Sequence, residues 1–396
     1  MLAVADRYTL PTDDTAAQTW AAEVGGVRVL FGEGILCGLG DEVRDLGASR
    51  ALLVSDAGVE AAGWVARALE CLDASGIATV AFTGVTENPT TDEVAAGAEV
   101  AREHGADILI GLGGGSPMDV AKGINFLLTQ GGQIADYWGW AKAKAPMLPS
   151  IGVPTTAGTG SDSQSFALIS DATTHAKMAC GAPAARFRSV LLDPALLTSV
   201  PKWVRATAGL DAIAHAVESY VSRKRNPIAQ LYAREAWRLL DGSFETYLAT
   251  PTDLDARGAM LFGAHLSGAA IEASMLGAAH ALANPLTKHF DVIHGSAVAL
   301  MLPSVVRFNA QAVAPLYAEL ATDAETLAAR LEDLRHVAGM PATLAEAGVD
   351  GDALDTLVSD AAGQWTARFN PRPLETSDLL DLYRQVSTPV SLAGSV

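Results

Sequence analysis

The chain has few cysteines, few aromatic residues and far fewer basic than acidic residues, and each shortage excludes a class of protein. Three cysteines in 396 residues, at the distant positions Cys37, Cys71 and Cys180, indicate neither a disulfide framework nor a cysteine-based metal site. Free thiols are typical of a reducing compartment, and residues 1–14 lack the basic start and apolar run of a secretory signal. The sequence therefore predicts a cytoplasmic protein.

Positive charge is also scarce. Twenty-seven Lys and Arg residues against 45 Asp and Glu residues give a formal charge of −18, which argues against nucleic acid or an anionic membrane as a partner. No stretch approaches the roughly 20 uninterrupted apolar residues of a membrane span. The composition is nonetheless 49% hydrophobic, which is enough to build two cores in a chain of this length.

Short β-rich runs alternate with amphipathic helical stretches up to about residue 198, a pattern typical of a mostly parallel sheet with helices on both faces. The predicted strands lie within residues 27–32, 50–57, 77–85, 106–115 and 149–158. After Pro194 and Pro201, long Ala- and Leu-rich helical segments dominate. We therefore predict an α/β dinucleotide-binding domain over residues 1–198, followed by an all-α domain over residues 199–396.

A glycine-rich loop follows the predicted strand that ends near residue 112. In GLGGGSPMD, the glycines Gly113, Gly114 and Gly115 would let the backbone approach a ligand closely. Ser116 is the expected N-cap of the next helix, and Asp119 stands where a capping-box acid would reach back. Free N–H groups at such a helix start attract a pyrophosphate, although an ordinary tight turn is the alternative.

A second loop, PTTAGTGSDS, also follows a predicted strand. Thr155, Thr156 and Thr159 offer hydroxyl groups to a ribose or a phosphate, with a flexible surface linker as the alternative. Two such loops at strand ends of one α/β domain favour a nucleotide. Asp56, which ends an earlier strand, could accept hydrogen bonds from a ribose and would repel a 2′-phosphate, which favours NAD over NADP.

The segment GLDAIAHAVESYVS places Asp211, His215 and Glu218 on one face of an otherwise apolar helix. Buried carboxylates and imidazoles need partners, and Asp-x-x-x-His is a natural platform for a divalent ion, although a helix-surface ion pair is the alternative. His280 and His294, at the two ends of HALANPLTKHFDVIH, would complete a set of one carboxylate and three imidazoles. Such a set suits Fe(II) or Zn(II).

The motifs GGGSPMD, PTTAGTGSD, GLDAIAHAVESY and GAAHALANPLTKHFDVIHG together resemble those of the iron-containing (group III) alcohol dehydrogenase family. The resemblance implies a dehydroquinate synthase-like architecture, with cofactor and metal between an α/β and an all-α domain. It implies metal ligands, catalytic through the metal, at Asp211, His215, His280 and His294. It implies cofactor contacts at Asp56, Gly113, Gly114, Gly115, Ser116, Asp119, Thr155, Thr156, Thr159 and Lys177.

The implied activity is the metal-dependent, NAD(H)-linked interconversion of a small primary alcohol and its aldehyde. Fe(II) is the expected metal, with Zn(II) and NADP(H) as the alternative metal and cofactor. Lys288 and His289 could bind an anionic tail of the aldehyde or could point to solvent. A hydroxyacid–oxoacid transhydrogenase, a lyase similar to dehydroquinate synthase, and a non-catalytic nucleotide-binding protein are the competing interpretations. The resemblance also implies a homodimer or a larger homo-oligomer.

Two positions depart from the family pattern. Many members carry a histidine credited with proton relay four residues after the third ligand, where this chain has Asn284. An amide cannot act as an acid or base near neutral pH, so water or another group, with His289 as a candidate, must carry the proton. Members usually carry Glu where this chain has Asp162. Ile271 and Leu276 are expected to narrow the pocket, which favours a small substrate.

Overall fold

A computed structural model describes residues 19–387, so the segment 1–14, on which the prediction of no secretory signal rests, lies outside the described residues. The first half contains a seven-stranded sheet in the order β1-β2-β10-β7-β5-β3-β4, parallel throughout except for the pair β1–β2. Its strands are β1 (Trp20–Val24), β2 (Val27–Phe31), β3 (Arg50–Asp56), β4 (Ala78–Val85), β5 (Ile108–Gly113), β7 (Ser150–Pro154) and β10 (Ser189–Leu192). This confirms the predicted mostly parallel sheet and all five predicted strands.

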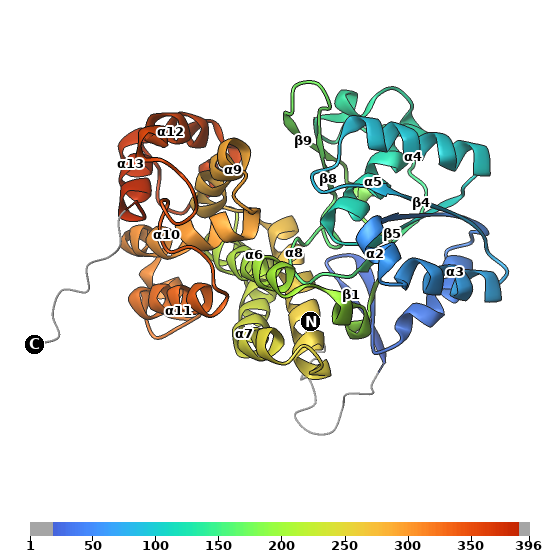
Figure 1. The fold of residues 1–396 in the computed structure, drawn as a ribbon, viewed down its shortest axis with the longest axis horizontal. Coiled ribbons are helices and arrows are strands. Elements are labelled where there is room, and N and C mark those ends of the chain that lie inside the picture. The colour runs from blue at the N-terminus through green and yellow to red at the C-terminus, as the bar shows by residue number, and fades with distance from the viewer. Residues whose placement is uncertain (1–18, 388–396) are drawn as a thin grey trace, which may run out of the picture.

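Helices cover both faces of the sheet, as Figure 1 shows for α2 and α3 on one side and α4 and α5 on the other. The helices of this half are α1 (Leu39–Asp45), α2 (Ala57–Ala61), α3 (Trp64–Ala74), α4 (Thr91–His104) and α5 (Gly115–Gln130). All six residues of β5 are buried because the strand lies inside the sheet, beneath helices on both faces. For this reason the strand reads as one continuous apolar run in the sequence.

The strand order reverses between β3 and β5. From β3 the chain crosses to β4 on one side, whereas β5 pairs with the other edge of β3 and leads on to β7. In open α/β sheets, ligands bind in the crevice at the carboxyl ends of the strands on either side of such a reversal. Here those two strands end at Asp56 and Gly113, and both residues belong to the predicted cofactor contacts.

A second, three-stranded sheet was not predicted. It has the order β6-β9-β8 and consists of β6 (Gly139–Trp140), β9 (Lys177–Gly181) and β8 (Phe166–Ser170). Strand β8 leaves the second predicted cofactor loop directly and packs against α5. This small sheet therefore fixes the end of that loop.

The second half is helical, as predicted. Its helices are α6 (Lys202–Val221), α7 (Pro227–Ala249), α8 (Leu254–Ala273), α9 (Ala278–Phe290), α10 (His294–Tyr317), α11 (Ala324–Val337), α12 (Leu354–Gly363) and α13 (Thr376–Gln385). Helix α6 is buried along most of its length because α7, α8 and α10 pack around it. One hydrophobic core runs from Leu53 in the sheet to Leu210 and Leu300 in these helices, so the division at residue 198 stays a prediction.

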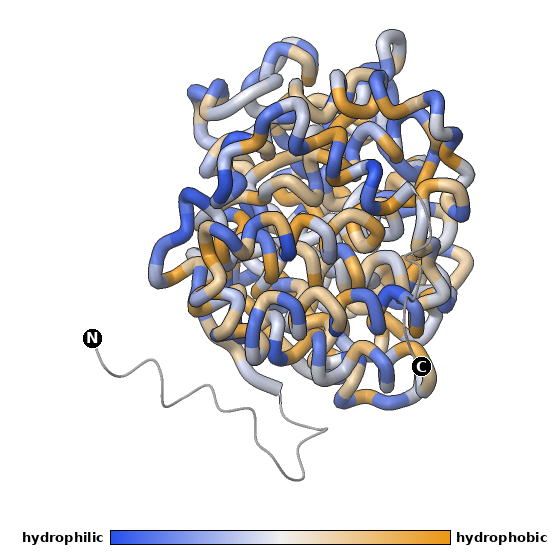
Figure 2. Tube along the Cα trace, turned by 90° about the vertical axis from the view of Figure 1, so that its left-hand side faces the viewer, coloured by the Kyte–Doolittle hydropathy of each residue, from blue (hydrophilic) through white to orange (hydrophobic). Residues whose placement is uncertain are grey.

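Within the described residues, α10 is long and apolar enough to cross a membrane by length and composition alone. However, 67% of its apolar window is buried inside the fold, as in the core helix of a globular protein. The pair α8 and α9 passes the same test only as one span bent by 106°. Figure 2 shows hydrophilic and hydrophobic stretches alternating along the chain, which is typical of amphipathic elements on a core.

Residues 155–165, which follow β7, join the two halves. A Cβ atom on Gly158 would lie 2.7 Å from the Ala208 carbonyl oxygen of α6, and one on Gly160 would lie 2.8 Å from the Gly268 Cα of α8. Gly160 also has a φ of 66°, a conformation that favours glycine. The backbone of this segment therefore rests directly on two helices of the second half.

A methyl group at position 268 should disturb that contact. A Cβ on Gly268 would lie 2.7 Å from the Gly160 Cα, so we expect Gly268→Ala to destabilise the protein by about 1–3 kcal/mol. Gly242→Ala in α7 is the matched control: among the described residues its Cβ meets nothing within 4 Å, and we expect a gain of about 0.5–1 kcal/mol. Urea-unfolding midpoints measure both effects, and equal midpoints would contradict the close contact.

Candidate metal and cofactor site

Four predicted ligands come together from three helices. Asp211 and His215 lie on α6, His280 lies on α9, and His294 is the first residue of α10. The Asp211 Oδ1 atom is 3.3 Å from the Nε2 atoms of both His215 and His280 and 3.7 Å from that of His294. Asp211, His215 and His280 are buried, with their ligand atoms within 4.8 Å of one another.

The donor atoms of this cluster fit a divalent cation. Within residues 19–387, Asp211 Oδ1 and His280 Nε2 are buried and have no hydrogen-bond partner, a costly state for polar atoms unless something binds them. Ligand atoms arranged tetrahedrally at about 2.1 Å from a metal are about 3.4 Å apart, which is close to the separations above. One carboxylate oxygen and three imidazole nitrogens also suit iron or zinc by ligand type.

Glu218, one turn beyond His215 on α6, orients one of the histidines. The Nδ1 atom of His280 donates to its Oε2 atom at 2.5 Å, and the backbone N–H of Ala279 donates to its Oε1 atom at 2.7 Å. Because the Nδ1 atom donates its hydrogen bond to Glu218, the ring is oriented so that its Nε2 atom faces Asp211. The sequence places Glu218 on the same polar face of the helix but does not reveal this partner.

Charges in the cluster shift one another's pKa values. Burial acts to raise the pKa of Asp211, but the imidazoles around it, His215 first, hold that pKa well below its usual range. Burial lowers the pKa of His215 to about 4. Burial also acts to lower the pKa of His280, but the Asp211 and Glu218 carboxylates raise it to about 9. At neutral pH the ionised carboxylate of Asp211 thus lies between a neutral His215 and a protonated His280, so metal binding at the His280 Nε2 atom would release a proton.

The two predicted cofactor loops contact each other and the end of β3. A Cβ on Gly114 would lie 3.4 Å from Thr156 Oγ1, and one on Gly115 would lie 3.0 Å from Thr159 Oγ1. A Cβ on Gly113, whose φ is 152°, would lie 3.2 Å from an Asp56 carboxylate oxygen. Asp56 also caps α2 by accepting from the backbone N–H of Val59 at 2.9 Å. These predicted cofactor residues therefore gather at the strand reversal.

Two predicted details of the first loop are wrong. The N-cap of α5 is Gly114, and Ser116 lies inside the helix, because Gly113 turns the backbone earlier than expected. Asp119 does not reach back to the cap: its Oδ1 atom accepts from Ser161 Oγ at 2.8 Å. The ammonium of Lys122, also on α5, donates to the Ser161 carbonyl at 2.5 Å. Asp119 and Lys122 are both buried and hold the second loop against α5.

Other predicted residues lie at the edges of the site. Lys177 is exposed and 3.5 Å from Asn88, and its charge helps to lower the pKa of His294 after the larger effect of burial. Lys288 and His289 both bind the Asp360 carboxylate at 2.8 Å. This shared partner compensates the charge of Lys288. The proposed roles of His289 in proton relay and of both residues in anion binding stay predictions.

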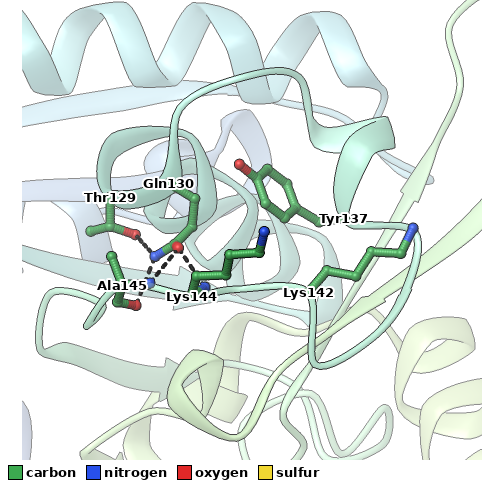
Figure 3. Close-up of a pocket in the computed structure, with 6 residues that line it drawn as sticks. All are labelled: Thr129, Gln130, Tyr137, Lys142, Lys144 and Ala145. Atoms are coloured by element: carbon green, nitrogen blue, oxygen red, sulfur yellow. Dashed lines mark hydrogen bonds between the residues drawn. The ribbon is translucent and has the colours of Figure 1, made fainter.

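A surface hollow of 380 Å³ lies apart from this site. It is lined by Thr129, Gln130, Tyr137, Lys142, Lys144 and Ala145 (Figure 3). The Gln130 side chain accepts from the backbone N–H groups of Lys144 and Ala145 at 2.8 Å, so the hollow is the inside of a tethered loop. Gln130 ends α5, about 24 Å along the helix axis from the glycine loop.

The fold and the site together define a class of protein. It has a mostly parallel α/β half of the kind that binds nucleotides and a helical half that holds a buried cluster of aspartate and histidine. Two family models cover most of the chain, "Iron-containing alcohol dehydrogenase" over residues 26–194 and "Fe-containing alcohol dehydrogenase family, C-terminal" over residues 205–387. The chain therefore belongs to the iron-containing alcohol dehydrogenase family, as the sequence motifs predicted. It is an enzyme of the alcohol dehydrogenase and aldehyde reductase type.

Similar proteins match along nearly their whole length. The chain is 32% identical over 370 residues to 1,3-propanediol dehydrogenase of Citrobacter freundii, which covers 90% of this chain and 96% of that protein. It is 27% identical over 368 residues to NAD-dependent methanol dehydrogenase of Bacillus methanolicus, with 90% and 97% covered. A solved structure of 1,3-propanediol oxidoreductase has a TM-score of 0.88 at 30% identity and covers 93% of this chain and 99% of that one.

The hydrogen bond between Glu218 and His280 should set the metal affinity. In Glu218→Gln the carboxylate is lost while the size is kept, and we expect about 10–100-fold weaker metal binding, since partners of metal-ligating histidines have effects of this size. Glu235→Gln on α7 is the matched control, because the Glu235 carboxylate is half-buried and pairs with Arg238, and this variant should bind metal as the parent does. Anaerobic titration with Fe(II) or Zn(II) measures both, and equal affinities would rule out the orienting role.

Proposed function

We propose that the enzyme interconverts a small primary alcohol and its aldehyde with NAD(H), at a metal held by Asp211, His215, His280 and His294. The supporting observation is the cluster itself, in which a buried carboxylate oxygen without a hydrogen-bond partner among the described residues faces three imidazole nitrogens. Fe(II), or Zn(II) as the alternative, would supply a Lewis acid that polarises the substrate oxygen.

The chain's own residues prepare the site for this chemistry. Asp211 contributes one negative charge, which would partly neutralise a divalent ion, and the hydrogen bond to Glu218 keeps the His280 Nε2 atom aimed at Asp211. The glycine loop and Thr155, Thr156 and Thr159 would bind the dinucleotide at the strand reversal, where N–H groups at the start of α5 attract a pyrophosphate. Burial of Asp211, His215 and His280 strengthens the charge interactions among them, whereas His294 lies at the partly exposed edge of the cluster.

The metal cluster is tested by removing its carboxylate. Protein purified anaerobically and reloaded with Fe(II) or Zn(II) should oxidise NADH with small aldehydes, and Asp211→Ala should lose both bound metal and activity. Asp333→Ala, which removes an exposed aspartate from α11, is the control and should keep both. Metal analysis and NADH absorbance are the measurements, and a metal-free Asp211→Ala protein with full activity would refute the proposal.

The preference for NAD(H) over NADP(H) rests on Asp56. Its carboxylate lies beside Gly113 at the strand reversal, where it would accept hydrogen bonds from a ribose and repel a 2′-phosphate. The methanol dehydrogenase relative is also named as NAD-dependent. A cytoplasmic location and assembly as a homodimer or larger homo-oligomer accompany this proposal as predictions.

Replacing Asp56 by asparagine separates its charge from its structural role. Asparagine caps helices as well as aspartate does, so Asp56→Asn should keep the cap on α2 and the unfolding midpoint. Loss of the negative charge should raise kcat/KM for NADPH by about tenfold or more relative to NADH, since two like charges about 4 Å apart near a protein surface repel each other by about 1–4 kcal/mol. An unchanged cofactor ratio in a stable variant would show that Asp56 does not select the cofactor.

A further inference from the structure

Four aromatic side chains form a continuous row that joins the two halves of the molecule. The ring centroids of Trp140 and Phe166 are 5.1 Å apart, those of Phe166 and Trp365 are 6.5 Å apart, and those of Trp365 and Phe369 are 6.0 Å apart. Trp140 and Phe166 belong to β6 and β8, whereas Trp365 and Phe369 belong to a short 3-10 helix after α12. We call these four residues the aromatic row.

The aromatic row lies outside the core. Trp140 is 51% exposed and Trp365 is 43% exposed, and none of the four side chains belongs to either hydrophobic core of the described residues. Exposing contiguous aromatic surface costs about 25 cal/mol for each Å² left in water. Such a patch marks a place where something apolar binds.

The backbone around the row is shaped to hold it. A Cβ on Gly181 of β9 would collide with the Phe166 ring and lie 2.8 Å from the Trp140 ring, so both rings lie over a glycine. The Phe166 carbonyl accepts from the buried Lys122 ammonium at 2.9 Å. Phe166 is therefore held by the same lysine that binds the second cofactor loop, and Trp140 is held by its strand in the small sheet.

The row is also linked to α9, the helix that carries His280. Asn284 stands one helical turn after His280 on α9, about 6 Å along the axis. Its Nδ2 atom donates to Gln364 Oε1 at 2.9 Å, and Gln364 directly precedes Trp365. On the other side, Phe166 directly follows the cofactor segment 155–165. The row thus begins where the cofactor segment ends, and its other half follows the residue that Asn284 binds.

We propose that the aromatic row binds the non-reacting end of the substrate, and that this end is an uncharged aromatic group. This inference rests on the proposed function and names the substrate class for the same site. Rings in offset or edge-to-face contact attract one another beyond their area burial, and the exposed faces of Trp140 and Trp365 are open to such contact. The alcohol or aldehyde would then be of the benzyl type.

A substrate with a charged tail fits the surroundings of the aromatic row less well than one with an uncharged ring. Lys224 already lies 4.7 Å from the centroid of the Phe369 ring, so a cationic tail at that end of the row would meet a like charge. Lys288 and His289, the candidate partners of an anionic tail, both bind Asp360, so an anionic tail would have to compete with that carboxylate. An uncharged ring meets neither obstacle.

The test compares four aldehydes of different tail chemistry in the metal-loaded enzyme with NADH: benzaldehyde, propanal, betaine aldehyde and succinic semialdehyde. We expect kcat/KM for benzaldehyde to exceed that for propanal by about tenfold or more. In Trp140→Leu and Trp365→Leu the ratio of the two values should fall about tenfold, mainly through a higher KM for benzaldehyde. Trp138→Leu is the matched control, because Trp138 is 52% exposed yet belongs to no ring pair of the described residues.

The outcomes separate this inference from the proposed function. A best substrate with a charged tail, or an unchanged ratio in both variants, would overturn the role of the row while leaving alcohol–aldehyde chemistry intact. Absence of turnover with every aldehyde would instead contradict the proposed function. In that case calorimetry with benzyl alcohol and NAD⁺ still tests the row, because binding that is tighter than for 1-propanol and lost in Trp365→Leu supports it. Equal binding of the two alcohols would refute it.

Discussion

Asp211 carries a negative charge in a place from which water is almost excluded, since only 6% of the residue is exposed. A buried carboxylate of this kind is stable only if opposite charge or hydrogen-bond donors surround it. The structure supplies imidazoles from α6, α9 and α10, and a second buried carboxylate, Glu218, that accepts a hydrogen bond from one of them. The arrangement of the three helices therefore depends on compensating this one charge, which is also what a divalent cation would do.

The cofactor segment 155–165 is held by contacts from both halves, and this couples the predicted cofactor site to the cluster. From the sheet side, Lys122 and Asp119 bind Ser161. From the helical side, His265 of α8 contacts Asp162 at 2.5 Å. Asp162 departs from the family pattern, in which Glu is usual. Its shorter side chain contacts His265 where the backbones of the segment and α8 approach closely at Gly160 and Gly268. A shift of either half would move the segment, so the cofactor and the metal are expected to keep a fixed separation.

Strands with helices on both faces could be predicted because their sequences are continuous apolar runs. Strands β6 and β10 span only two and four residues, too few to show a hydrophobic periodicity. Asp211 and His215 were visible because one helix brings them together. The partner of Glu218 lies 62 residues away, and no local spacing encodes that contact. Local rules failed at Asp119, where the capping pattern was outweighed by the buried Lys122 and Ser161. The aromatic row was missed because its members come from distant segments.

Asn284 shows how one substitution can change the task of a position beside the cluster. In many resembling proteins this position carries a histidine credited with proton relay, but the amide here donates to Gln364 and so fastens the segment that carries Trp365. An amide cannot take up or release a proton near neutral pH, so proton exchange with the substrate oxygen must pass through water or another group. The same side chain thereby holds the second half of the aromatic row in place. At this position the chain therefore has an amide that joins two segments instead of a group that can titrate.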